Sequence, residues 1–164
     1  MNLTATVKGV ITGLLMIAIG LLIYFNNIAG NSAWQYAGYL VYGIGVVWSI
    51  AAFAQRRKGN VTFGELFNQG FRCFIVVTLL MSLYTLIYYK SNTKVIEEKA
   101  AYTRRELLKK EQNRTPQEID AMIETGKKNF PVMAASGAIF QYLFIGVIVT
   151  MATAGTLYLR NKNQ

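Results

Sequence analysis

Residues 62–90 read TFGELFNQGFRCFIVVTLLMSLYTLIYYK, and this stretch decides the fold. It opens with a capping box, because the Thr62 hydroxyl can accept a hydrogen bond from the backbone N–H of Glu65 while the Glu65 carboxylate reaches back to Thr62. After Arg72 it is apolar on all sides to Tyr89, and the predicted span of residues 71–89 has about the 20 residues that a helix needs to cross a bilayer. The stretch therefore predicts a membrane-spanning helix whose first turns lie in the headgroup region.

Three other stretches have a similar length and composition. The four predicted spans are residues 7–25, 33–54, 71–89 and 132–159. Together they take up about half of the 164 residues, so too little remains for a separate soluble core. The sequence predicts an all-α integral membrane four-helix bundle, a single membrane domain over residues 1–164, with an extramembrane helical hairpin between spans three and four.

The predicted hairpin is a charged insert at residues 91–130. Thr93–Gln112 has a helix-forming composition, and Glu106 can pair with Lys110 one turn later. Thr115–Glu118 starts a second helix with Thr as cap, Pro at the first helical position and Glu to close the capping box. Asn113–Arg114 is predicted to break the two helices apart. We expect Gly126 to end the second helix and Pro131 to start the last span.

The charge pattern limits the possible partners. The formal net charge is +9, and the basic residues outside the insert flank the predicted spans, where such residues usually set topology and contact lipid headgroups. We therefore expect the lipid bilayer, and not nucleic acid, as a partner. The linker Asn26–Ala33 carries no charge, whereas Arg56–Arg57–Lys58 resists export. This asymmetry predicts a multi-pass membrane protein with both termini in the cytoplasm.

The chain offers few groups for catalysis. It has no histidine and one cysteine, Cys73, inside the third span. The commonest metal ligand and general base is therefore absent, and the sequence shows no nucleophile–base pair and no phosphate loop. We expect no catalytic residue, no cofactor and no metal, and hence no enzyme.

One cluster of polar side chains lies close to a span. Glu65, Asn68 and Arg72 share one face of the third helix, at positions i, i+3 and i+7. As a polar notch, these side chains could bind a headgroup, an ion or a partner protein. The structural alternative is that Glu65 only caps its helix and that Arg72 extends to the interface.

Small residues recur at a spacing of four, which allows helices to approach closely. They indicate packing inside the predicted bundle or, as the alternative, association with another membrane protein. The candidate packing residues are Gly9, Gly13, Gly45, Ser49, Gly146 and Thr150. Two other polar groups are interpreted structurally: Tyr36, Tyr39 and Tyr42 as interfacial or packing residues rather than a substrate path, and Gln141 as a residue that forms an interhelical hydrogen bond.

The order of these parts resembles a known family. A predicted hairpin is followed by TFGELFNQGF at residues 62–71, by a span that ends in LIYYK at residues 86–90, and by TPQEIDAMIETGKKNF at residues 115–130. In this order the chain is similar to the domain-of-unknown-function family 4199, small membrane proteins of Bacteroidota. The resemblance implies no catalytic residues. It does imply a role near envelope or lipid-linked glycan assembly, because genes of this family often neighbour a glycosyltransferase gene.

Two kinds of function remain open. The first is a non-enzymatic accessory or scaffold subunit that packs against a larger membrane protein, such as a glycosyltransferase, or against itself. The second is an oligomeric transporter of small solutes or lipids, which would need a polar path through the spans. For the charged insert, partner recognition and a solvated connector are equally compatible with the sequence.

Overall fold

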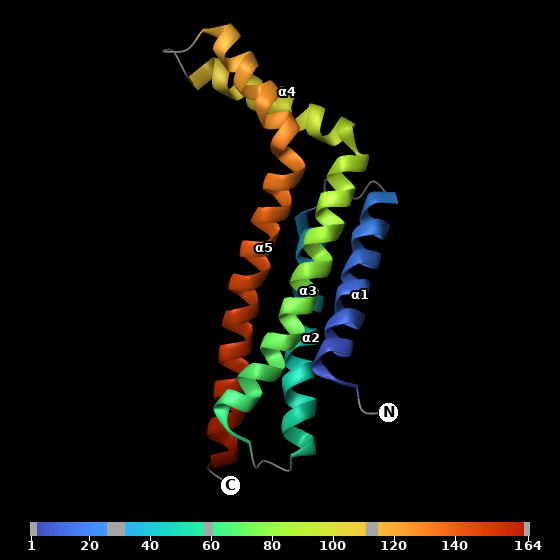
Figure 1. Cartoon of the computed structure of the whole chain (residues 1–164), viewed down its shortest axis with the longest axis vertical. Coiled ribbons are helices and arrows are strands. Elements are labelled where there is room, and N and C mark those ends of the chain that lie inside the picture. Colours follow the sequence, from blue (N-terminus) through green and yellow to red (C-terminus); the bar gives the residue numbers. More distant parts are fainter. Residues whose placement is uncertain (1–2, 26–31, 58–60, 111–114, 163–164) are drawn as a thin grey trace. The chain divides into compact units, whose positions relative to one another are not determined.

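The computed structural model describes residues 3–25, 32–57, 61–110 and 115–162, and within these ranges all regular structure is helical (Figure 1). The helices are α1 (Ala5–Phe25), α2 (Ser32–Arg56), α3 (Phe63–Ser91), α4 (Thr93–Lys110) and α5 (Pro116–Lys162). The predictions made for residues 26–31, for Lys58 and for the Asn113–Arg114 break lie outside the described residues.

Four of the helices are long and apolar enough to cross a membrane, namely α1, α2, α3 and α5. Each contains one predicted span, so the all-helical class and the four apolar segments are confirmed. The start of α3 at Phe63, directly after Thr62, agrees with the predicted capping box.

The predicted boundary between the second insert helix and the last span is wrong. Helix α5 runs without interruption for 47 residues, with Gly126 and Pro131 both inside it. An interior glycine costs about 1 kcal/mol and a proline about 3 kcal/mol relative to alanine. Ending one helix and starting another would instead leave four carbonyls and four N–H groups without helical partners. Continuing through both residues is therefore the less costly arrangement.

The chain forms two compact units. The first contains residues 1–81 and 139–164, and the second contains residues 82–138, so that α3 and α5 contribute to both. In the first unit, helices meet where side chains are small. A Cβ atom added to Gly9 of α1 would lie 2.7 Å from the Cys73 carbonyl oxygen of α3. Helices α1 and α3 therefore approach closely through backbone at this point.

The interior of the first unit combines large apolar side chains with small polar ones. The fully buried apolar residues include Tyr42, Val46, Ile50, Leu66, Phe74 and Val77. The outward positions are apolar as well: Phe140 and Phe144 of α5 are 75% and 70% exposed. An apolar exterior around a core that contains hydroxyl groups suits a lipid environment, in which packing and polar contacts hold helices together.

Candidate functional site

The first turn of α3 uses Glu65 as a capping residue. The Glu65 carboxylate accepts hydrogen bonds from the Thr62 backbone N–H at 2.9 Å and from the Thr62 hydroxyl at 3.0 Å. The Glu65 backbone N–H donates to the Thr62 hydroxyl oxygen at 3.3 Å, which completes the reciprocal capping box. The Arg57 guanidinium also lies near it, at 4.0 Å. The carboxylate is therefore already occupied by local contacts.

The other two residues of the predicted notch lie together one turn later. Arg72 Nε donates a hydrogen bond to Asn68 Oδ1 at 3.2 Å along the exposed side of α3. Arg72 also lines a cavity whose wall does not include Glu65 or Asn68. Within the predicted cluster, Glu65 is therefore a capping residue, whereas Arg72 lines the cavity.

This cavity, which we call the basic cavity, has a volume of about 240 Å³. It lies among the first residues of α1, the end of α2 and the first turns of α3, within the first unit. Its polar lining comes from Lys8, Ser49, Arg56, Gln69 and Arg72, and Leu3 to Thr6 and Phe53 complete the wall. Three cationic side chains from three helices therefore converge on one small space.

Each cation of the basic cavity has an identifiable contact within the protein. Lys8 is only 3% exposed, and its Nζ lies 5.1 Å from the centre of the Trp48 ring. Arg56 Nη1 donates to the Leu3 carbonyl at 3.4 Å. Arg72 contacts Asn68 as described above. In the described part of the chain, no carboxylate lies within ion-pair distance of any of the three.

Ser49 adds an unpaired hydroxyl to the same cavity. It is 1% exposed, and its Oγ has no hydrogen-bond partner among the described residues. The neighbouring Cys73 thiol lies 3.9 Å from the Gly45 carbonyl oxygen and also lies beside the Ser49 side chain. A buried hydroxyl without a partner costs about 1–3 kcal/mol, so a group that fills the cavity and bonds to Ser49 would recover that cost.

The six predicted packing residues are all buried at helix contacts. Added Cβ atoms would collide with Leu80 at Gly13, with Thr12 at Gly45 and with the Tyr42 hydroxyl and Phe74 at Gly146. Ser49 and Thr150 are 1% and 0% exposed. These contacts join α1 to α2 and α3, and α5 to α2 and α3, inside the first unit.

Tyrosines of α2 connect to α5 through their hydroxyl groups. Gln141 Nε2 donates to the Tyr39 hydroxyl oxygen at 2.6 Å, which confirms the predicted interhelical hydrogen bond. The Tyr42 hydroxyl donates to the Tyr142 carbonyl at 2.7 Å, and Tyr42 is fully buried. Both contacts serve packing, in line with the structural interpretation of these tyrosines.

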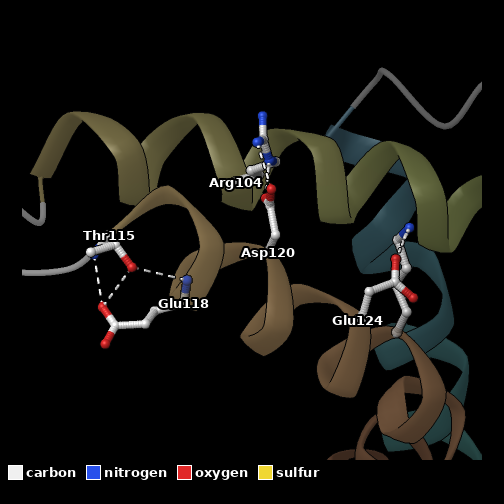
Figure 2. Close-up of polar contacts among 6 residues, drawn as sticks. Arg104, Thr115, Glu118, Asp120 and Glu124 are labelled. Atoms are coloured by element: carbon white, nitrogen blue, oxygen red, sulfur yellow. Dashed lines mark hydrogen bonds and ion pairs between the residues drawn. The ribbon is translucent and has the colours of Figure 1, made fainter.

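The second unit has its own polar contacts (Figure 2). The Arg104 guanidinium of α4 forms a two-point ion pair with Asp120 of α5, and its Nη2 lies 2.9 Å from Asp120 Oδ2. The hydrogen bond and charge of Arg104 hold the pKa of the Asp120 carboxyl below its usual value. The Thr115 backbone N–H donates to Glu118 at 2.8 Å, as the predicted capping box requires. The predicted Glu106–Lys110 pair is also present, at 3.2 Å.

An apolar groove of about 220 Å³ lies between α4 and α5 within the second unit. Its apolar lining consists of Ile96, Ala100, Leu107, Met122, Ile123, Phe130 and Met133. At one end, Phe130 packs edge-on against Tyr89 with 4.9 Å between ring centres. The Lys99 ammonium lies 5.4 Å from the centres of both rings. The groove thus has an apolar floor and a cationic end.

The sequence interpretation missed the basic cavity although its signals were present. Lys8 lies 18 residues before Asn26, and Arg56 lies 23 residues after Ala33. The linker Asn26–Ala33 is short, so the two predicted helices that it joins pair antiparallel. Lys8 and Arg56 then lie at a similar depth in the membrane. Each was interpreted only as a charge that flanks a span. The contribution of Ser49 and Gln69 depends on helix rotation, which the apolar pattern does not specify.

The described residues contain no group of three or more His, Cys, Asp or Glu side chains that could hold a metal ion. No curated protein and no solved structure matches the chain. A family profile described as "Protein of unknown function (DUF4199)" matches residues 8–157, which include the basic cavity's Lys8, Arg56 and Arg72 and the whole second unit. The chain belongs to this family of proteins of unknown function.

Proposed function

We propose that the four apolar helices form a four-helix bundle in a bacterial inner membrane, with residues 91–130 of the second unit as an extramembrane helical hairpin. Three observations support this arrangement: the four apolar helices, the close contacts at Gly9, Gly45 and Gly146, and the exposed apolar side chains of α5. The uncharged sequence at residues 26–33 and the basic end of α2 favour termini in the cytoplasm.

Within that arrangement, the protein is a non-enzymatic accessory or scaffold subunit of a larger membrane complex. One observation carries this proposal: the apolar groove of the second unit lies in an otherwise charged element. Its wall includes Met122, which is 47% exposed. An apolar groove between two amphipathic helices suits a helix of another protein, whose apolar side chains would fill the floor.

The net positive charge of the segment that carries the groove indicates which side chains a partner should offer. Residues 90–128 contain ten basic and seven acidic side chains, a net charge of +3. Lys99 at the end of the groove contacts aromatic rings and the Tyr89 hydroxyl, but no carboxylate among the described residues. A partner helix with aliphatic residues beside acidic ones would complement both features. A glycosyltransferase of lipid-linked glycan assembly is the partner that the gene neighbourhood of the family implies.

The test compares two substitutions to glutamate on different faces of α4. Leu107→Glu puts a charge into the groove, whereas Ala101→Glu puts the same charge on a different, exposed face. Affinity purification of the full chain in mild detergent, with identification of partners, should recover a membrane protein with the wild type and with Ala101→Glu. It should lose that partner with Leu107→Glu at equal accumulation. Equal recovery with both variants would place recognition elsewhere and refute the role of the groove.

A second function, transport by an oligomer, is favoured by one observation. The hydroxyls of Ser49, Thr78 and Thr150 are buried in the first unit, and that of Thr150 has no hydrogen-bond partner among the described residues. Such groups could line a polar path for water or a small solute. Solute flux into vesicles that is lost in a Thr78→Val variant, but kept in Leu107→Glu, would favour transport over the scaffold role.

A further inference from the structure

The basic cavity holds more positive charge than the protein balances. Lys8, Arg56 and Arg72 line it together, and no carboxylate lines it. Residues 1–96 contain a single acidic residue, Glu65, whose carboxylate is bound by Thr62. Charges withdrawn from water cost several kcal/mol each unless an opposite charge pairs with them. Arg56 and Arg72 are exposed, so this cost falls mainly on the buried Lys8, and an anion that enters the cavity would pair with its ammonium group.

We propose that the basic cavity binds a phosphate-bearing anion. The guanidinium groups of Arg56 and Arg72 offer planar forks that match phosphate oxygens, and Lys8 adds a point charge from the buried side. Arg56 uses one donor on Leu3 and Arg72 one on Asn68, which leaves further N–H donors on both side chains.

Ser49 provides a second and independent reason for a ligand. Its buried hydroxyl lines the cavity and has only the weakly hydrogen-bonding Cys73 thiol beside it, with no nitrogen or oxygen partner among the described residues, so a phosphate oxygen would accept its hydrogen bond. A volume of 240 Å³ corresponds to about eight water molecules at about 30 Å³ each. A phosphate group with a few bound waters fits within this space. The inference does not depend on the scaffold role, because it concerns other residues and another unit.

Two sources can supply the phosphate: the headgroup of an anionic phospholipid or free inorganic phosphate. The first arm of the test titrates the full chain in detergent with phosphatidylglycerol, and counts bound lipids by native mass spectrometry. Arg56→Gln and Arg72→Gln should each weaken binding about fivefold, as expected for the loss of one basic contact. Arg57→Gln is the matched control, because Arg57 is the neighbouring cation and does not line the cavity. It should change binding less than twofold.

The second arm measures the thermal unfolding of the same four proteins in sodium phosphate and in sodium chloride of equal ionic strength. A phosphate-specific rise in Tm that Arg56→Gln and Arg72→Gln lose, without a variant effect on lipid binding, assigns the site to free phosphate. A variant effect on lipid binding assigns it to the headgroup. If Arg57→Gln weakens binding as much as Arg72→Gln, or if neither arm distinguishes the cavity variants from the wild type, the proposal is wrong.

Discussion

The contact between α1 and α2 can be tested by adding one methyl group to either of two glycines. A Cβ atom at Gly45 would lie 2.9 Å from the Thr12 Cβ, with the Thr12 hydroxyl and methyl groups closer still. A Cβ atom at Gly43, two residues earlier on the same helix, would meet nothing within 4 Å. The same substitution to alanine therefore creates a collision at one position and none at the other.

The size of the expected loss in folding stability depends on how little the Thr12 side chain can move. Its side chain is 3% exposed, and its hydroxyl donates to the Lys8 carbonyl at 2.8 Å. Rotating a β-branched side chain in a helix is restricted, and here it would also break that hydrogen bond. We expect an overpacking cost of about 1–3 kcal/mol for Gly45→Ala. Both substitutions gain about 0.5–1 kcal/mol from the lower flexibility of alanine in a helix. Gly45→Ala should therefore be less stable than Gly43→Ala by about 1–3 kcal/mol.

The assay is reversible unfolding of the full chain by sodium dodecyl sulfate in mixed micelles, followed by tryptophan fluorescence. The free energy of unfolding of each variant is compared with that of the wild type. Gly43→Ala should match or exceed the wild type, and Gly45→Ala should fall below Gly43→Ala. A difference within about 0.5 kcal/mol, which is the usual error of additivity, would show that α1 and α2 do not approach as described.

Three further predictions concern other parts of the chain. For topology, a cysteine at Arg57 should resist a membrane-impermeant maleimide in intact cells, and labelling there would overturn the cytoplasmic placement; the native Cys73 is buried and gives little background. At Glu65, exchange to Gln should leave accumulation and function unchanged because Gln also closes a capping box, and a loss of function at normal accumulation would show that the charge itself is needed. Arg104 lowers the pKa of Asp120 in the folded protein. The ion pair therefore stabilises the fold fully at pH values above the pKa of a free aspartate, about 3.9. This stabilisation is lost as the pH falls through the lower pKa of Asp120 in the folded state. The protection of α4 amides relative to their intrinsic exchange rates should therefore fall below pH 4 in the wild type but not in Asp120→Asn, and equal pH profiles of protection would contradict this.

The apolar helices could be predicted from sequence because length and composition alone define them. The capping boxes at Thr62 and Thr115 were predictable for a similar reason, since each depends on residues three apart. Pro131 was misleading because its usual position at a helix start is only a statistical preference. The cost of a proline inside a helix is small compared with that of two new helix ends.

The candidate site was less predictable because it depends on contacts between helices. The sequence placed Arg72 in a notch with Glu65 and Asn68, which are its neighbours on one helix face. The structure instead brings Arg72 together with Lys8 and Arg56, which lie 64 and 16 residues away in sequence. Helix periodicity specifies which residues share a face, but it does not specify which face of another helix they meet.

The two proposals are chemically separable, and this separation strengthens each test. The anion site depends on positive charge in the first unit, and Arg72→Gln removes one such charge without altering the apolar groove. Recognition of a partner depends on apolar contact in the second unit, and Leu107→Glu disrupts that contact without altering the basic cavity. Arg72→Gln should therefore weaken lipid or phosphate binding and retain the partner, whereas Leu107→Glu should do the reverse. If either substitution abolished both properties at normal accumulation, the two units would be coupled, and neither site could be assigned to one unit alone.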